Sequence, residues 1–171
     1  MNLGVLSRLR QFFSPPQLLT LYRGLIPPCM EYVSHVWGGS TLTALLNRVE
    51  SKAFRLIDSS PLTDCLQPLS HRHNVASLGL FYQYFHANCS SDLSNCMPPL
   101  LARPRCTRIT SSSHPFCVHL SNARVNLYSQ SFLPFSGKFW NALPASVFPP
   151  PYDLNYFKKE VSRHLSHSFA Y

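Results

Sequence analysis

Three cations in the first half of the sequence have the spacing that phosphate contacts on a helix require. Arg48, Lys52 and Arg55 lie four and three residues apart, so on an α-helix they form one row. Such a row can follow the phosphates of a nucleic-acid backbone, a contact that positions the polymer without reading its bases. Taken alone, a row of this kind is more often only a solvated helix face.

More basic residues gather in the second half of the chain. The segment between Asp92 and Asp153 contains no acidic residue but holds five cations, which are Arg103, Arg105, Arg108, Arg124 and Lys138. Over the whole chain 15 lysines and arginines stand against seven acids, a formal net charge of +8. This balance favours a polyanionic partner, RNA or DNA. A basic surface that only aids solubility is the alternative.

Catalytic and metal-binding residues are not predicted. The seven acids are scattered, whereas polymerase or nuclease chemistry needs carboxylates that hold two cations about 4 Å apart. The nearest approach to a zinc site is the set Cys89, Cys96, Cys106 and Cys117 with His114 or His119. Zinc ligands normally come in pairs two to four residues apart, which these cysteines do not form. We therefore predict no catalytic residue, no metal and no cofactor.

The N-terminal stretch bears on the predicted location. Residues 1–13 carry Arg8 and Arg10 inside an apolar run, which suits neither the core of a secretory signal nor a membrane span. We expect an intracellular protein, nuclear or cytoplasmic, that is not secreted and has no membrane partner. The six cysteines are then interpreted as reduced thiols.

Apolar periodicity predicts a mainly α-helical chain. Helical spacing is found at 3–13, from 17 to 37 with a break at Pro27 and Pro28, at 42–57, at 70–87, between Pro134 and Pro144, and at 154–169. Fifteen prolines keep these helices short. The region 89–127 is predicted to be loop-rich, with 105–110 and 116–120 paired as a short β-ribbon, and the terminal helix is amphipathic.

An aromatic stretch from 132 to 148 is predicted to organise the core. It contains five aromatic residues, Trp140 among them, and a short helix there presents a wide apolar surface. The predicted core residues are Tyr22, Tyr32, Trp37, Phe139, Trp140 and Leu143. We expect a helical region at 1–88, a connector at 89–127 and a final segment at 128–171, sharing one packed unit.

Four blocks of the chain carry a family resemblance. The blocks are Leu21-Tyr-Arg-Gly-Leu-Ile-Pro-Pro-Cys-Met-Glu-Tyr32 with Trp37-Gly38, Leu46-Asn-Arg-Val-Glu-Ser-Lys-Ala-Phe-Arg-Leu-Ile57, His71-Arg-His-Asn-Val-Ala-Ser-Leu78 and Trp140-Asn-Ala-Leu-Pro144. In this order they resemble "LYKxLIRPxLEYxxxxW", "LDRVQRRALRLI", "HRRDVASL" and "WNxLPxxV" of reverse transcriptases from non-LTR, LINE-like or jockey-type, retrotransposons.

The resemblance implies the thumb and C-terminal extension of an RNA-directed DNA polymerase, without its catalytic palm. Such a thumb-like bundle would hold the template–primer by phosphate contacts, with Arg72 of the third block as a further ligand and the upstream polymerase domains as a partner. Pro27, His73 and Phe135 stand where the family is usually basic. The alternative is therefore an inactive structural or interaction remnant of a decayed element.

Overall fold

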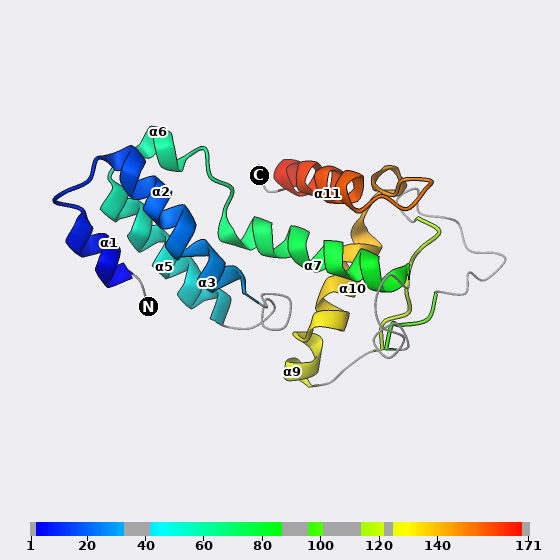
Figure 1. Cartoon of the computed structure of the whole chain (residues 1–171). Helices are drawn as coiled ribbons and strands as arrows, with labels where there is room; N and C mark the ends of the chain where they lie inside the picture. The colour runs from blue at the N-terminus through cyan, green and yellow to red at the C-terminus, as the bar shows by residue number, and fades with distance from the viewer. Residues whose placement is uncertain (1–2, 33–41, 87–95, 101–113, 122–124, 169–171) are drawn as a thin grey trace.

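The chain is mainly helical, as the apolar periodicity predicts. A computed structural model describes residues 3–32, 42–86, 96–100, 114–121 and 125–168. In order, the described elements are α1 (Leu3–Leu9), α2 (Pro15–Leu25), α3 (Pro27–Glu31), α5 (Leu42–Ile57), α6 (Ser60–Thr63), α7 (Leu69–Phe85), α9 (Asn126–Ser129), α10 (Phe132–Ala142), the 3-10 turn η1 (Ala145–Val147) and α11 (Leu154–Ser168) (Figure 1). Trp37, Arg103, Arg105, Arg108 and Arg124 lie outside the described residues.

Prolines set the boundaries of the first helices. Pro15 and Pro16 occupy the first turn of α2, where their missing N–H groups would have no helical partner anyway. Ser14 and Gln17 form a capping box at this end, with the Ser14 N–H donating to Gln17 Oε1 at 2.9 Å. Pro27 then interrupts the backbone ladder and begins α3. The predicted break at this position is confirmed.

Tyr32 does not join the core, so its predicted place there is wrong. α3 ends at Glu31, and the backbone of Tyr32 turns to φ −57° and ψ 119°, outside the helical region. The side chain therefore leaves the apolar stripe that the sequence spacing suggests. It is 77% exposed.

Two apolar cores lie side by side, and α7 contributes to both. The N-terminal core consists of the buried residues Leu6, Leu18, Leu19, Tyr22, Ile26, Met30, Ala53, Ile57 and Leu69. The C-terminal core consists of Leu78, Phe81, Tyr82, Val118, Trp140, Leu143, Val147, Phe157, Val161 and Leu165. Because α7 begins in one core and ends in the other, it joins α1, α2 and α5 to α10 and α11 (Figure 1).

Trp140 is the centre of the C-terminal core, as predicted. Its side chain is fully buried, with ring centroids 4.9 Å from Phe81 and 5.8 Å from Phe157. These contacts connect α10 with α7 and α11. Leu143 is also buried, whereas Phe139 is half-buried against the same core.

The neighbouring Asn141 holds the loop that precedes α9. Its side-chain oxygen accepts the Val118 N–H and its amide nitrogen donates to the Val118 carbonyl, each at 2.9 Å. His114 adds a second attachment, because its Nε2 lies 2.8 Å from the Trp140 carbonyl while its Nδ1 accepts the Phe116 N–H. Only the neutral ring with its proton on Nε2 satisfies both hydrogen bonds. The Trp-Asn pair thus connects α10 to residues 114–118.

The predicted β-ribbon has no counterpart among the described residues, which contain no strand. Residues 105–110 lie outside them, and 116–120 contribute only an isolated antiparallel bridge between Val118 and Leu100. The side chain of Asn141 already occupies both backbone polar groups of Val118 on the other side. No further strand can pair there.

The terminal helix α11 begins and packs as predicted. Asp153 Oδ1 accepts the N–H groups of Asn155 and Tyr156 at 2.9 and 3.0 Å, which caps the helix. The side chain of Lys158 in α11 lies over Gly79 of α7, where an added Cβ would be 2.7 Å from its Cε. Within the described ranges, no helix combines the length and apolar character that a membrane crossing needs.

Candidate nucleic-acid interface

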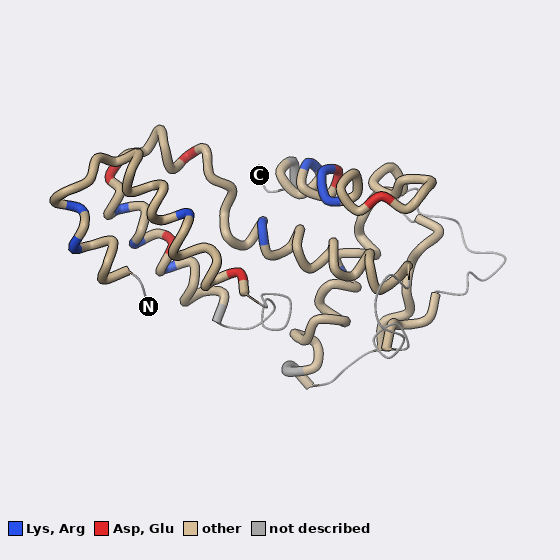
Figure 2. The backbone as a smooth tube through the Cα atoms, in the orientation of Figure 1, with Lys and Arg blue, Asp and Glu red and all other residues tan. Residues whose placement is uncertain are grey.

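The outer face of α5 carries the three cations that the sequence analysis placed in one row. Ala53 and Ile57 lie buried in the N-terminal core, whereas Arg48, Lys52 and Arg55 are exposed. At about 1.5 Å per residue the row spans about 10 Å. We refer to Arg48, Lys52 and Arg55 as the basic row. Figure 2 shows the lysines and arginines along the backbone in blue, including those of α5 and of its neighbour α1.

Nothing in the described part of the chain neutralises the basic row. Four of its six acids pair with other cations: Glu31 and Glu50 with Arg72, Asp58 with Arg10, and Glu160 with Arg163. The other two, Asp64 and Asp153, accept hydrogen bonds from neighbouring residues. Asp58, the described acid at the end of this row, is paired with Arg10, so the exposed face of α5 presents positive charge to a polyanion.

Arg72, predicted as a phosphate ligand, forms two ion pairs within the protein instead. Its Nη1 lies 2.8 Å from Glu31 Oε1, and its Nη2 lies 3.0 Å from Glu50 Oε1. Both terminal nitrogens of the guanidinium thus pair with carboxylates, one from α3 and one from α5. We leave Arg72 out of the interface.

Glu50 is the centre of this buried polar network. It lies on the inner side of α5, 7% exposed, and accepts the Tyr22 hydroxyl at 3.1 Å and the Leu69 N–H at 3.1 Å besides Arg72. Burial and the Glu50 charge raise the pKa of Tyr22 well above its ordinary value, so its hydroxyl stays a donor. The network ties α2, α3, α5 and α7 together.

Lys138 is exposed on α10 and belongs to a different surface. It lies two residues before the buried Trp140, and this spacing turns the two side chains to opposite sides of the helix. Trp140 thus points inward and Lys138 to solvent. α10 packs against the C-terminal core, whereas the basic row lies over the N-terminal core.

The three positions where the resembling family is usually basic do not face open solvent. Pro27 and His73 are buried, and Phe135 is half-buried with its ring 5.1 Å from that of Phe139. A cation at Pro27 or His73 would be placed in the interior. Restoring arginine there would therefore test folding and not phosphate binding.

Burial disfavours the protonated form of two histidines of α7. The Nε2 of His71 lies 2.9 Å from Ser162 Oγ of α11, and burial lowers the pKa of His71. Burial and then the charge of Arg72 lower the pKa of His73, against an opposing hydrogen bond with the Met30 backbone. Both residues thus favour the fold in their uncharged form.

Acidification to about pH 5.5 is expected to destabilise the protein. The unfolded chain binds protons at His71 and His73 near pH 6.5, whereas the folded chain resists them, so stability present above about pH 6.5 is lost below it. Denaturant titrations at about pH 7.5 and at about pH 5.5 measure this loss of stability. The double variant His71→Gln/His73→Gln should show a smaller loss between the two pH values. A wild type that becomes more stable in acid would contradict the assignment.

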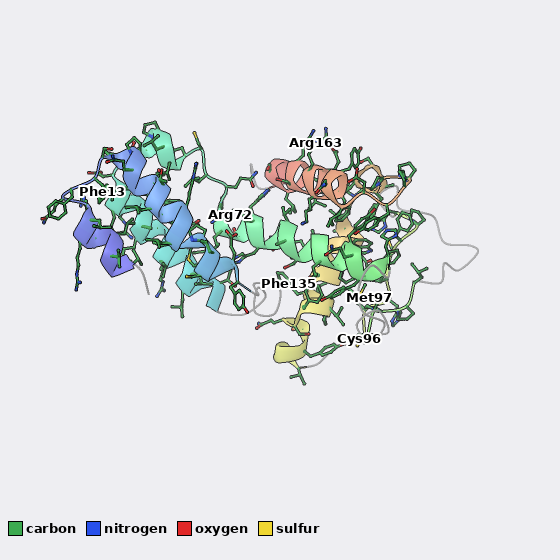
Figure 3. The ribbon with its side chains drawn as sticks, viewed as in Figure 1. Phe13, Arg72, Cys96, Met97, Phe135 and Arg163 are labelled. Carbon is green, nitrogen blue, oxygen red and sulfur yellow. The ribbon has the colours of Figure 1, made fainter. Side chains whose placement is uncertain are left out.

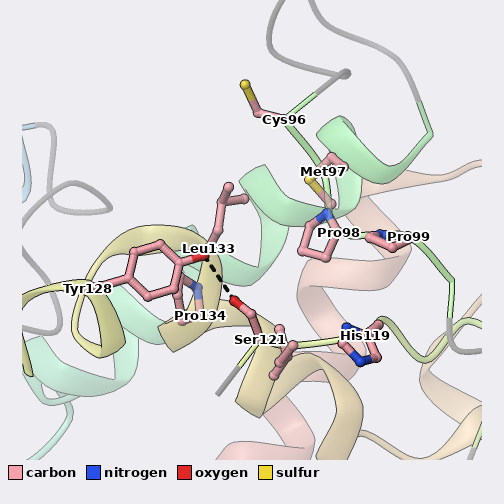
Figure 4. Close-up of a pocket in the computed structure, with 10 residues that line it drawn as sticks. Cys96, Met97, Pro98, Pro99, His119, Ser121, Tyr128, Leu133 and Pro134 are labelled. Atoms are coloured by element: carbon pink, nitrogen blue, oxygen red, sulfur yellow. Dashed lines mark hydrogen bonds between the residues drawn. The ribbon is translucent and has the colours of Figure 1, made fainter. Parts of the chain in front are cut away.

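A cavity between residues 96–99 and the start of α10 carries no lysine or arginine to bind an anion. It has a volume of about 260 Å³, and the Ser121 and Tyr128 hydroxyls meet there at 3.3 Å (Figure 4). The lining residues are Cys96, Met97, Pro98, Pro99, His119, Leu120, Ser121, Tyr128, Leu133 and Pro134. They include no lysine or arginine. Likewise, no three potential metal ligands come together in the described ranges.

The sequence analysis missed the polar network around Glu50. A signal for it was present, because Glu50 is three residues before Ala53 and seven before Ile57, on the apolar side of the helix. An acid at such a position needs a partner. What the sequence could not supply is the identity of that partner, since Arg72 lies 22 residues further along.

Comparison with known proteins adds no relative to this picture. No family model matches the chain, and no curated protein and no solved structure is similar to it.

Proposed function

We propose that the chain is a nucleic-acid-binding module that holds RNA or DNA by its phosphates through the basic row. In this proposal it serves as the thumb and C-terminal part of a retrotransposon RNA-directed DNA polymerase and performs no polymerase chemistry itself. The polymerase domains of the same element would be its protein partner.

The observation that carries the proposal is the uncompensated basic row on α5. Three cations share one exposed face, while the acids of the described part are engaged elsewhere. Over about 10 Å, the row matches about three successive phosphates of one strand, given about 3.4 Å of axis per phosphate. The four sequence blocks in the order of the resembling family support the same role.

Removing the charge of the basic row is expected to weaken binding of a nucleic-acid duplex by about a hundredfold at 0.1 M salt. Each phosphate contact contributes about 0.9 to the slope of the logarithm of the association constant against the logarithm of salt concentration. Three contacts together therefore account for a loss of affinity of about this size. The variant Arg48→Gln/Lys52→Gln/Arg55→Gln replaces each cation by a neutral polar residue of good helix propensity on an exposed helix face and should fold normally. Fluorescence anisotropy with a labelled duplex measures the change.

A matched control removes three charges from α11. The variant Lys158→Gln/Lys159→Gln/Arg163→Gln has the same net charge as the variant of the basic row, but its Arg163 pairs with Glu160 and its Lys158 lies over Gly79. We expect it to lose less than about fivefold in affinity, through long-range attraction alone. Equal losses in the two variants would contradict a defined site on α5.

A further inference from the structure

An ordered turn between α1 and α2 exposes two aromatic rings. The Phe12 N–H donates to the Leu9 carbonyl at 2.9 Å and the Phe13 N–H to the same carbonyl at 3.2 Å. The capping box of Ser14 and Gln17 fixes the chain immediately afterwards. Despite this fixed backbone, Phe12 is 79% and Phe13 38% exposed. We name residues 11–13 the aromatic turn.

The aromatic turn lies at the C-terminal end of the basic row. Arg10 Nη2 forms an ion pair with Asp58 Oδ2 at 3.2 Å, and Asp58 follows directly after α5, three residues past Arg55. This pair fixes the turn against the end of α5. Figure 3 shows Phe13 on the turn between α1 and α2, at the far end of the molecule from α10 and α11.

Charge around the turn matches a polyanion. Arg8 and Arg10 immediately precede it, and the one described acid beside it, Asp58, is occupied by Arg10. An aromatic ring next to cations and at the end of a phosphate-binding row has the composition of sites that stack on nucleic-acid bases. A base in the middle of a duplex has no free face, whereas an unpaired or terminal base does.

We propose that the aromatic turn stacks on an unpaired base that follows the duplex held by the basic row. Phe12, the more exposed ring, provides the stacking face, and Arg10 positions the turn. The inference rests on the proposed function, because the row must first bring the phosphates to α5. It predicts that the chain prefers a duplex with a single-stranded overhang to a blunt duplex.

The test compares two duplexes of equal paired length, one blunt and one with an overhang that carries 2-aminopurine. We expect the overhang to be bound about tenfold more tightly and its fluorescence to change on binding, as base–aromatic stacking requires. Phe12→Ala should abolish both effects and leave the affinity for the blunt duplex unchanged. Phe12→Trp should retain them. Tyr32→Ala, which removes another exposed aromatic ring, should change neither.

Each contrary result has a separate meaning. Equal affinity of the wild type for the two duplexes would overturn the stacking proposal while the proposed function stands. Failure to bind either duplex would overturn both. Analytical ultracentrifugation tests whether the turn is instead a contact between copies of the chain. This contact would be identified, and the proposal overturned, if the wild type self-associates and shows no overhang effect while Phe12→Ala no longer self-associates.

Discussion

Trp140→Ala is expected to lower the free energy of unfolding by about 3–5 kcal/mol, a large part of the 5–15 kcal/mol typical of a domain. The side chain is fully buried between α7 and α11, so its removal leaves a cavity between these helices. The variant also loses the hydrogen bond from Nε1 to the Phe116 carbonyl, at 2.8 Å. That bond attaches the loop before α9 to the core.

Chemical denaturation followed by circular dichroism measures this loss. Lys138→Ala on the same helix is the matched control, because an exposed charge contributes little to stability. It should unfold within about 0.5 kcal/mol of the wild type. A stable Trp140→Ala together with an unfolded Lys138→Ala would invert the assignment of inner and outer faces on α10.

Glu50→Ala is expected to destabilise the protein by a similar amount, about 3–5 kcal/mol. The substitution leaves the Arg72 guanidinium with Glu31 alone and deprives the Tyr22 hydroxyl and the Leu69 N–H of their acceptor. Buried donors without acceptors keep the full cost of their desolvation. The loss falls on four helices at once, since α2, α3 and α5 each contribute one member of the network and α7 contributes Leu69 and Arg72.

A graded series separates charge from hydrogen bonding in this network. Tyr22→Phe removes one hydrogen bond and should cost about 1 kcal/mol. Glu50→Gln keeps an acceptor but not the charge, so its loss should lie between those of Tyr22→Phe and Glu50→Ala. Arg72→Gln should lower stability and leave the salt dependence of duplex binding unchanged. An Arg72→Gln variant that folds normally but binds weakly would return Arg72 to the interface.

The helices could be predicted because each carries its own apolar stripe and its own boundary residues. The stripe of α5, the capping Asp153 of α11 and the break at Pro27 are local signals, and the structure follows them. Tyr32 shows their limit. Its spacing continues the stripe, but α3 is too short to carry it that far, and the backbone turns away.

The candidate interface could be predicted only where the exposure of a side chain follows from one helix alone. The basic row lies opposite the apolar side of α5, so its exposure follows from periodicity. Arg72 also lies on a helix, yet its role depends on Glu31 and Glu50, which approach it only in the folded chain. Periodicity cannot show such pairing, because Arg72 and its two partners lie on three separate helices.

The salt dependence of duplex affinity tests the phosphate-binding proposal most directly. If the basic row contacts three phosphates, the logarithm of the association constant should fall with the logarithm of salt concentration at a slope steeper by about 2.7 in the wild type than in Arg48→Gln/Lys52→Gln/Arg55→Gln. Anisotropy titrations between about 50 and 200 mM salt give both slopes. Equal slopes, or wild-type affinity that does not change with salt, would contradict the proposal.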